Sequence, residues 1–424
     1  MNSILLITQE YPINRGDSCF IVNEIPYLSG KFDKIHVLCL SNKEKDDELL
    51  DVPDNVSVYF ISNNYRKLYN YIHFFRIIFM SVFYCEILWL IKNKKFSFRG
   101  LKYAISYVYR AIILKKHTKY ILKKDNDINI IYTFWYLHET LSALLLKRKF
   151  KNVNYITRAH GYDIHEFQRD LNYQPYKFWM DKEIDKIFFA SQYLRNYYID
   201  KFSGCDHEKY ITMPLGIINN YSSSVIKNEK TGIFTLCSCS YIIPRKRVHL
   251  IVKALEQIND FSIHWIHIGD GSDMNNIMSL CNDLLKNKKN ITYEFKGFMT
   301  NGQIMRFYNE KYIDCFISAT EAEGGRPVSI MEAISFGIPV IATGVGGVPE
   351  IVNKDTGFLL NPEGDIAEIG STITGFYNLA ETEKNALRLS ARLFWENNFN
   401  AEKNYETFSD ILLSISSNNN GNYT

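Results

Sequence analysis

The sequence is poor in the patterns that mark specialised protein classes. It has 10 prolines and 22 glycines in 424 residues, with a hydrophobic content of 46%. This excludes collagen-like and disordered chains, because enough apolar surface is present to offset chain entropy. The 8 cysteines form no C-x-x-C pair and no cluster with histidines, so we expect neither a zinc site nor a disulfide framework. Lys and Arg exceed Asp and Glu by only 3, too few to indicate a nucleic-acid partner, and we expect none.

No apolar run is long enough to cross a bilayer. The longest mainly apolar run, residues 77–91, contains Ser81 and Glu86, whereas a spanning helix needs about 20 apolar residues. The chain starts with a short apolar run, residues 4–8, without a basic start or a small-residue cleavage site, so we expect no signal peptide. Together with the isolated cysteines, this indicates a protein of the reducing cytoplasm.

One segment departs from the neutral charge balance. Residues 64–124 contain 14 Lys and Arg side chains but a single acid, Glu86, and they are rich in Tyr, Phe, Trp, Ile and Leu. Basic residues mixed with aromatics at helical spacing are typical of helices that lie on an anionic membrane surface. The same pattern also fits an ordinary solvated face over a helical core. Charge alone leaves both interpretations open.

Apolar strand-like runs alternate with amphipathic helical runs along the whole chain. This alternation predicts parallel sheets covered on both faces by helices. The predicted strands are 3–8, 34–40, 56–61, 128–133, 153–158, 186–190, 234–239, 262–268, 291–295, 315–318, 339–343 and 356–360. The predicted helices are 20–28, 138–147, 192–199, 248–257, 274–286, 301–310 and 329–336, followed by a long helical tail from residue 367.

The pattern starts again after a polar stretch, residues 219–231, which we interpret as a linker. We therefore predict an α/β protein with two tandem Rossmann-like domains, 1–218 and 219–396. In open sheets of this kind ligands bind at the carboxyl ends of the strands, so we expect the active cleft between the two domains. Residues 417–424 read as a disordered tail.

Three loops of the second half are suited to a diphosphate. Residues 321–333 (EAEGGRPVSIMEA) follow a strand and open a helix, so backbone N–H groups and the helix N-terminus can face an anion, while Glu332 can accept the hydroxyls of a ribose. Residues 344–350 (GVGGVPE) repeat the arrangement after the next strand, and residues 244–247 (PRKR) supply positive charge. Each loop alone fits tight turns or a solvated basic surface; together they favour an anion site.

These motifs resemble glycosyltransferase family 4, and the resemblance extends over nearly the whole chain. Its signature region is EGGRPVSIMEAISFGIPVIATGVGGVPE, residues 323–350. The other matching marks are YP with Gly16, FIVNEIPYLS from residue 20, TRAHGYD from 157, MPLGI from 213, IPRKRV from 243, IGDG from 268, FKGF from 295 and GFLL from 357. The resemblance implies the GT-B fold, retention of anomeric configuration, nucleotide-sugar donors, a hinge at residues 219–231, and a helix, residues 397–416, that crosses back to the first domain.

The resemblance also implies roles for individual residues. Gly16 would let the first loop approach the donor phosphate, His160 would face the donor sugar, and Lys246 would neutralise the leaving diphosphate. Phe298 would lie at the nucleobase, while Glu323 would contact the sugar and Glu332 the ribose. The expected catalytic residues are His160, Glu323 and Lys246. The expected substrate-binding residues are Gly16, Arg245, Phe298, Gly324, Gly325, Arg326, Pro327 and Glu332.

Two departures from the family pattern affect these roles. Eight residues separate Glu323 from Glu332 instead of seven, so the loop must bulge, and Glu321 is a second candidate for the sugar contact. Tyr241 stands where the family often has an arginine. Arg245 or Arg326 could replace that charge, because a diphosphate needs about two positive contacts or a helix dipole. No acidic pair follows a strand in the second half, so we expect a metal-independent enzyme without a cofactor.

His160 and Asp163 also have simpler interpretations. A lone histidine after a strand is more often structural than catalytic, and only the resemblance makes His160 a strong candidate. We expect Asp163 to cap the following helix and to orient its neighbours.

We therefore expect a glycosyltransferase that moves a hexosyl group from a nucleotide diphosphate sugar to a hydroxyl of a lipid-linked glycan acceptor. The product would belong to a cell-surface polysaccharide: capsule, exopolysaccharide or lipopolysaccharide. The basic stretch, residues 64–124, would hold the enzyme on the anionic inner face of the cytoplasmic membrane. The alternatives are a GT-B-fold nucleotide-sugar epimerase and a catalytically silent membrane-associated scaffold.

Overall fold

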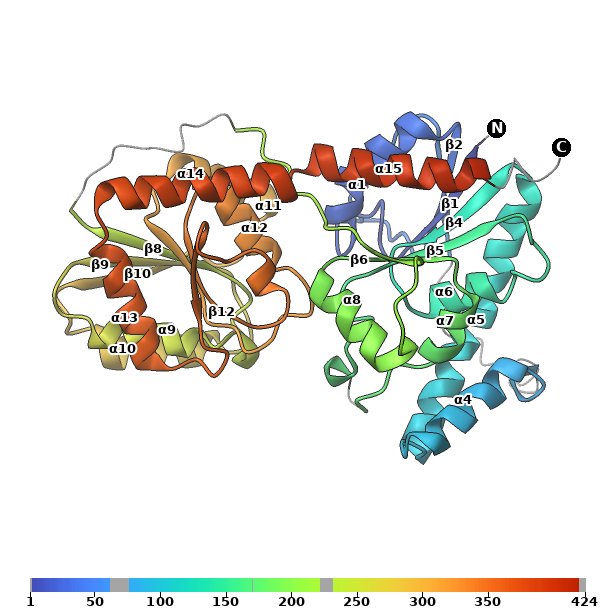
Figure 1. The fold of residues 1–424 in the computed structure, drawn as a ribbon, viewed down its shortest axis with the longest axis horizontal. Helices are drawn as coiled ribbons and strands as arrows, with labels where there is room; N and C mark the ends of the chain where they lie inside the picture. The colour runs from blue at the N-terminus through green and yellow to red at the C-terminus, as the bar shows by residue number, and fades with distance from the viewer. Residues whose placement is uncertain (1, 62–75, 170, 222–231, 419–424) are drawn as a thin grey trace. The chain divides into compact units, whose positions relative to one another are not determined.

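The computed structural model describes residues 2–61, 76–169, 171–221 and 232–418 (Figure 1). The chain divides into two compact units: residues 1–216 with 401–424 form unit 1, and residues 217–400 form unit 2. Most of the predicted linker and tail, and the start of the basic stretch, lie outside the described residues. Each unit has its own hydrophobic core, built on its own sheet.

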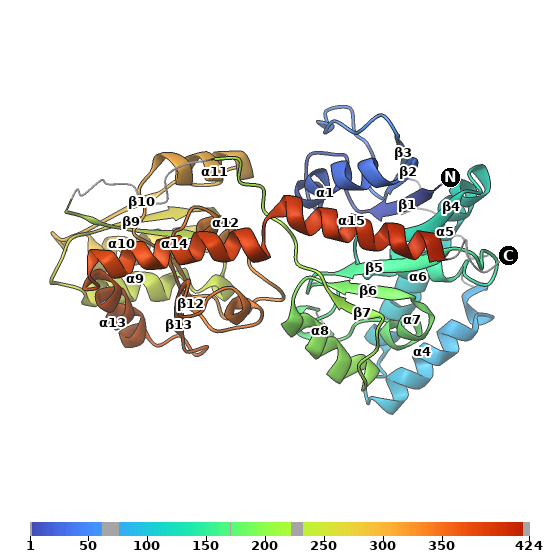
Figure 2. The same ribbon diagram turned by 45° about the horizontal axis from the view of Figure 1, so that its top comes forward.

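Unit 1 contains a seven-stranded sheet in the order β3-β2-β1-β4-β5-β6-β7 (Figure 2). Every strand pair is parallel, and the strand order reverses between β1 and β4, the place where such sheets bind ligands. All side chains of β1 and β4 are buried, as expected for strands covered on both faces. The strands are β1 Ser3–Thr8, β2 Lys34–Cys39, β3 Val56–Phe60, β4 Ile128–Thr133, β5 Asn154–Ala159, β6 Lys186–Phe189 and β7 Tyr210–Thr212.

The described helices of unit 1 include one from the end of the chain. The α-helices are α1 Ser18–Lys31, α4 Ser81–Lys92, α5 Phe98–Lys124, α6 His138–Leu144, α7 Lys177–Glu183, α8 Gln192–Tyr198 and α15 Ala401–Asn418. The C-terminal α15 packs on α1, where the rings of Tyr27 and Tyr405 lie 6.0 Å apart. Its Phe408 ring covers the guanidinium of Arg158, which forms a buried ion pair of 3.2 Å with Glu24.

Helices α4 and α5 follow β3 and precede β4 in the chain, and α4 lies at the outer edge of unit 1 (Figures 1 and 2). The inner face of α4 buries Phe83 and Leu90, and it also buries Glu86, which accepts a hydrogen bond from the Tyr173 hydroxyl. Its outer face exposes apolar side chains, including Leu88 at 67% and Ile91 at 56%. Among the described helices, none combines the length and the hydropathy needed to span a bilayer.

Unit 2 contains a six-stranded parallel sheet in the order β10-β9-β8-β11-β12-β13. The strands are β8 Phe234–Cys239, β9 Ile263–Ile268, β10 Ile291–Phe295, β11 Cys315–Ser318, β12 Val340–Thr343 and β13 Gly357–Leu360. The α-helices are α9 Val248–Gln257, α10 Met274–Leu285, α11 Asn301–Glu310, α12 Val328–Ser335, α13 Ile366–Tyr377 and α14 Glu381–Asn398. Here the order reverses between β8 and β11, which places the carboxyl ends of these strands at the ligand position.

The predicted fold class, two tandem Rossmann-like domains of the GT-B type, is confirmed. Two short elements were not predicted: β7, which has three residues, and α7, which starts after Tyr176 in a left-handed conformation (φ 61°). The helix predicted over 397–416 starts at Ala401 instead. The chain breaks the helical pattern at Phe399 because its carbonyl accepts a hydrogen bond of 2.8 Å from the Ile217 amide.

Candidate functional site

A cavity of about 330 Å³ lies in unit 2 at the carboxyl ends of β8 and β9 and beside the loop after β11. We call it the unit 2 pocket. It brings together five of the predicted site residues: Lys246, Phe298, Glu323, Pro327 and Glu332. The other lining residues are Cys239, Ser240, Tyr241, Ile268, Gly269, Asp270, Met299, Ile304, Val328 and Ser329.

Two carboxylates of the pocket have different environments. Glu323 forms an ion pair with the Lys246 ammonium. Glu332 is buried and accepts a hydrogen bond from the Asn301 side-chain amide at the start of α11. Burial raises the pKa of Glu332 to about 8, although the bond from Asn301 opposes the rise. Glu332 therefore holds a proton at neutral pH and can act both as a donor and as an acceptor toward hydroxyl groups.

Glycines of the second loop support the backbone of the first. A Cβ on Gly346, whose φ is +56°, would lie 1.9 Å from the carbonyl oxygen of Glu323, and one on Gly347 would lie 2.6 Å from that of Gly325. A Cβ on Gly269 would likewise lie 2.0 Å from the Ser240 carbonyl oxygen. Side chains at these positions would displace the backbone that forms the pocket, so the loops pack directly on one another.

The three basic residues after β8 have three different surroundings. Lys246 lines the pocket, whereas Arg245 is exposed and its guanidinium lies 3.4 Å from the Ala322 carbonyl. Arg247 donates hydrogen bonds of 2.8 to 2.9 Å to the carbonyls of residues 319, 320, 362 and 363. Arg247 thus joins the loops after β11 and β13, a structural role that the sequence pattern did not indicate.

In the loop before α12, Glu323 lines the pocket and Glu321 does not. Glu321 is exposed, and its amide donates to the Arg245 carbonyl. The Arg326 guanidinium pairs with Glu350 and lies 5.3 Å from the centre of the Phe399 ring. Arg326 and Arg245 are thus outside the set of pocket-lining side chains, as are Gly324 and Gly325. Pro327 precedes the first turn of α12, whose backbone amides start at the pocket wall.

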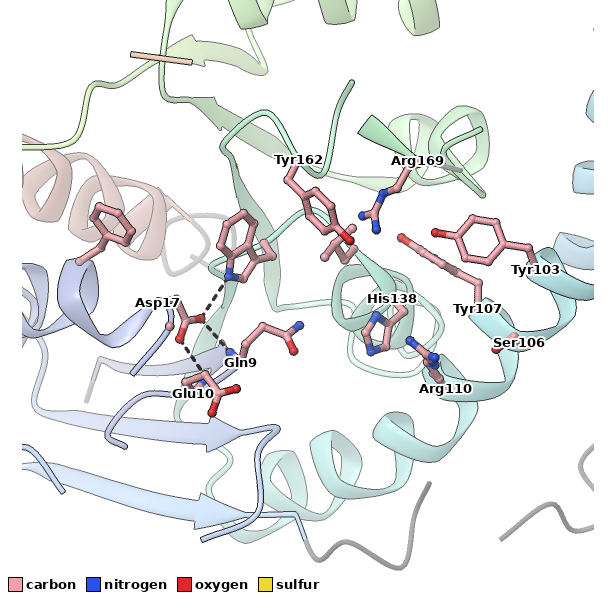
Figure 3. Close-up of a pocket in the computed structure, with 14 residues that line it drawn as sticks. Gln9, Glu10, Asp17, Tyr103, Ser106, Tyr107, Arg110, His138, Tyr162 and Arg169 are labelled. Carbon is pink, nitrogen blue, oxygen red and sulfur yellow. Dashed lines mark hydrogen bonds between the residues drawn. The ribbon is translucent and has the colours of Figure 1, made fainter. Parts of the chain in front are cut away.

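A second cavity, of about 440 Å³, lies in unit 1 (Figure 3). We call it the unit 1 pocket. Gly16 lines it with a φ of +58°, as do Gln9 and Glu10 from the loop after β1. The opposite wall comes from α5 and from the loop before α7. The remaining lining residues are Asp17, Phe20, Tyr103, Ser106, Tyr107, Arg110, Trp135, Leu137, His138, Tyr162 and Arg169.

Asp17 organises the loop that carries Gly16. Its carboxylate accepts hydrogen bonds from the amides of Gln9 and Glu10, at 2.8 and 2.9 Å, and from the Trp135 indole at 3.1 Å (Figure 3). Three donors hold this buried carboxylate in one place. Gly16 was predicted as a site residue and Asp17 was not. The glycine next to Asp17 was the only nearby signal in the sequence.

His160 lies beside the unit 1 pocket but does not line it. Its ring stacks on Phe134 at 4.5 Å, and its Nε2 donates to the Phe134 carbonyl at 3.0 Å. Burial lowers the pKa of His160 to about 4, so the ring is neutral at pH 7. Asp163 caps no helix, contrary to expectation; it accepts hydrogen bonds from the amides of Tyr136, His160 and Gly161, and so orients the turn.

Several residues of the two pockets were not predicted from the sequence. Asn301, which binds the pocket residue Glu332, and Arg169, which lines the unit 1 pocket, belong to no motif. The α5 residues Tyr103, Tyr107 and Arg110 were predicted only as members of a basic, aromatic helix, without a role in a pocket. The helical spacing of three or four residues between them was the one signal that they share a face.

Comparison with known families agrees with the geometry of unit 2. Residues 222–389 match the family model of the group 1 glycosyl transferases. The putative colanic acid biosynthesis glycosyltransferase WcaL of Escherichia coli is 25% identical over 218 residues, which cover 50% of this chain and 53% of that protein. The amylovoran biosynthesis glycosyltransferase AmsK of Erwinia amylovora is 31% identical over 119 residues, 27% of this chain and 29% of that protein. The matches thus span about half the length of WcaL and less of AmsK.

Solved structures share the fold over nearly the whole chain. The Anabaena protein Alr3699/HepE, in a structure with UDP and glucose, has a TM-score of 0.64 and 15% sequence identity. The alignment covers 97% of this chain and 99% of that one. At this identity the likeness concerns the fold.

Proposed function

We propose that this chain, whose residues 222–389 match the family model of the group 1 glycosyl transferases, is a glycosyltransferase that uses a nucleotide diphosphate sugar. The observation that carries the proposal is the unit 2 pocket, where Lys246, Glu323 and Glu332 meet at the carboxyl ends of the strands. We assign the donor to this pocket and the acceptor to the unit 1 pocket.

The donor assignment follows from the charges in the unit 2 pocket. The Lys246 ammonium can pass from Glu323 to the diphosphate, which leaves the Glu323 carboxylate available for hydroxyls of the sugar. Val328 and Ser329, in the first turn of α12, line the same cavity, so the amides at this helix start can add donors for an anion. Glu332 would hold the ribose, and the exposed Phe298 would lie at the base. The complex of Alr3699/HepE with UDP and glucose supports the choice of a nucleotide as the ligand.

In the proposed reaction, an acceptor hydroxyl oxygen forms a bond to the anomeric carbon, and the bond from that carbon to the diphosphate oxygen breaks. The hydroxyl proton leaves with the diphosphate, whose developing charge Lys246 stabilises. We propose retention of configuration, in line with the family resemblance. An inverting route would need a general base that activates the acceptor hydroxyl on the face of the sugar opposite the diphosphate. The pKa of His160, lowered to about 4, makes its ring a weak base for this purpose and so supports retention.

We further propose that the product belongs to a cell-surface polysaccharide. The names of WcaL and AmsK, which refer to colanic acid and amylovoran biosynthesis, support this class of product.

The test is incubation of the protein with a panel of nucleotide sugars, followed by nuclear magnetic resonance. A transferase releases free sugar slowly from its own donor and forms a glycosidic bond with the donor's anomeric configuration when a suitable glycan is added. A new epimer of the nucleotide sugar would replace the proposal with an epimerase. No turnover of any donor, with or without glycan, would favour a catalytically silent scaffold.

We also propose that unit 1 binds the anionic inner face of the cytoplasmic membrane, where a lipid-linked acceptor would be found. The supporting surface, which we call the α4 surface, combines exposed apolar side chains with exposed basic ones. The apolar members are Phe79, Tyr84, Leu88, Ile91, Phe96 and Phe98, and the basic members are Lys92, Lys94, Arg99 and Lys102. Exposed rings and aliphatic side chains beside lysines and arginines suit a lipid surface better than a solvated face.

Lys95 does not belong to this surface, because its ammonium is bound to Glu166 at 2.6 Å and to the Asn172 carbonyl.

Sedimentation with anionic liposomes tests the proposal that unit 1 binds the membrane. We expect binding at low salt, release at high salt, and no binding after the four basic members are changed to Glu, since each contributes about 1 kcal/mol. The matched control changes four exposed lysines of unit 2 to Glu: Lys253, Lys286, Lys289 and Lys354. Equal loss in the control, or no binding by the unchanged protein, would remove the lipid-linked acceptor from the account.

A further inference from the structure

The unit 1 pocket has two sides of different chemistry. Figure 3 shows Gln9, Glu10 and Asp17 on one side, with Arg110 and Arg169 on the other. The acids are already engaged: Glu10 pairs with Arg15 at 2.9 Å, and Asp17 accepts the three hydrogen bonds described above. The acids on the first side are therefore already paired, whereas the two arginines on the other side remain to be accounted for.

The two arginines have no acidic partner in the described part of the chain. Glu166, close to Arg169 in the sequence, pairs with Lys95 and Lys201 instead. The Arg169 guanidinium stacks 3.7 Å from the centre of the Tyr162 ring, and its buried Nε has no hydrogen-bond partner among the described residues. A planar fork of N–H donors held against an aromatic ring is oriented for a planar or tetrahedral oxyanion.

Tyr107 adds a third donor to the same side. Its side chain is only 5% exposed, it lines the pocket, and its buried hydroxyl has no hydrogen-bond partner within the described residues. The hydroxyl ends of Tyr103 and Tyr107 point toward Arg169 and Tyr162 (Figure 3). A buried hydroxyl without a hydrogen-bond partner costs free energy. A ligand that accepts a hydrogen bond from this hydroxyl removes that cost.

We infer that the unit 1 pocket binds an anionic group of the acceptor, a phosphate or a carboxylate, through Arg110, Arg169 and Tyr107. The inference rests on the proposed function, because it describes the acceptor of that reaction. The tyrosine rings around the arginines provide apolar faces for a sugar ring beside the anion. Two acceptor classes carry such a group: a glycan linked to lipid through a diphosphate, and a glycan that contains an acidic sugar.

The test is calorimetric titration with inorganic diphosphate, glucuronate and glucose at fixed ionic strength. The background is Lys246→Ala, which removes the phosphate contact proposed for unit 2. We expect at least one of the two anions to bind, and Arg110→Ala or Arg169→Ala to weaken that binding about 10-fold or more. Tyr107→Phe should weaken it about 5-fold. Arg148→Ala, an exposed arginine of unit 1 outside the pocket, is the matched control and should change nothing.

Diphosphate and glucuronate distinguish the two acceptor classes. Arginine-dependent binding of diphosphate indicates a diphosphate-linked acceptor, and the same result with glucuronate indicates an acidic sugar. No binding of either anion at about 10 mM, equal binding of glucose, or binding that ignores both arginines would overturn the inference. Nucleotide-sugar turnover is measured separately in the unchanged protein, so a failed transferase and a failed anion pocket give different results. The conservative Arg110→Lys and Tyr107→Phe variants keep the test valid if an alanine variant does not fold.

Discussion

The two pockets are built on similar sheets in different ways. The unit 2 pocket is formed mostly by loops directly after strands, with glycines that let one backbone lie against another and with an ion pair at its centre. The unit 1 pocket depends on side chains from α5, a 27-residue helix between β3 and β4. The first combines side chains with closely packed loop backbones, and the second relies on the side chains of a helix.

This difference separates what loop backbones supply from what helix side chains supply. Backbone amides and close loop packing suit the part of a substrate that many relatives share, such as a diphosphate. The pocket-facing side chains of a helix can change without altering the loops at the strand ends, so they suit the part that differs between relatives. We therefore expect variants in unit 2 to affect turnover with any acceptor, and variants in unit 1 to affect the choice of acceptor.

The largest effect is expected on turnover, where Lys246→Ala and Arg110→Ala should differ. Lys246→Ala should lower kcat about 10²–10³-fold, because it removes a contact to the charge that develops on the leaving group. Arg110→Ala should raise the acceptor KM and leave the slow release of sugar from the donor unchanged. Lys253→Ala, on the exposed side of α9, is the control. Steady-state kinetics with both substrates measure the split, and a near-normal kcat for Lys246→Ala would contradict the donor assignment.

The next effect concerns how unit 2 supports its loops. Arg247→Ala should lower the free energy of unfolding by about 2–3 kcal/mol, since a charged donor that satisfies four carbonyls is lost. Arg245→Ala should change it by less than about 0.5 kcal/mol, because the side chain is exposed. Denaturant unfolding of both variants measures the difference. Equal values for the two neighbours would contradict the role given to Arg247.

A smaller effect tests whether backbone contact shapes the unit 2 pocket. Gly346→Ala should cost about 1–3 kcal/mol of stability, because φ is +56° and the added Cβ would meet the Glu323 carbonyl. It should also weaken nucleotide binding. Gly302→Ala is the matched change, since a Cβ there meets nothing within 4 Å, and it should raise stability by about 0.5–1 kcal/mol. Unchanged nucleotide affinity in Gly346→Ala would mean that the second loop does not hold the first.

A further comparison takes one buried acid from each unit. Burial raises the pKa of Glu332 and of Glu139 from 4.5 to about 8. Each acid keeps a proton in the folded chain that the unfolded chain releases, so stability is lost as pH rises from about 4.5 to about 8. Relative to the unchanged protein, Glu332→Gln and Glu139→Gln should gain thermal stability over this range. If their unfolding midpoints run parallel to that of the unchanged protein from pH 5 to 8, the raised pKa values are wrong.

The sequence predicted most of unit 2 and the framework of unit 1. Strand β8 and helices α9 and α11 have the predicted bounds, because each is a strongly periodic run between clear turn residues. The basic loop and Glu332 were predicted because loops after parallel strands meet at one edge of a sheet, whereas Glu323 was predicted from the family resemblance. Of the two candidate glutamates, Glu323 lines the pocket and Glu321 does not.

What the sequence did not predict depends on contacts between distant residues. The carbonyls bound by Arg247 lie 72 to 116 residues further along the chain, so its role could not be separated from those of its two basic neighbours. Arg169 meets α5 only after the chain has passed through β4, β5 and a turn. The partner of Lys95 is likewise 71 residues away, so a basic residue counted for the membrane belongs to an internal ion pair.

Titration of UDP, GDP and ADP into the unchanged protein and into Lys246→Ala and Glu332→Ala tests the donor assignment most directly. We expect at least one nucleotide to bind, with an affinity about 10-fold or more lower in each variant, since each loses a hydrogen bond to a charged or buried group. Binding should persist in Arg110→Ala, which alters unit 1 alone. No binding of any nucleotide, or equal affinity in all four proteins, would contradict the claim that the unit 2 pocket holds a nucleotide sugar.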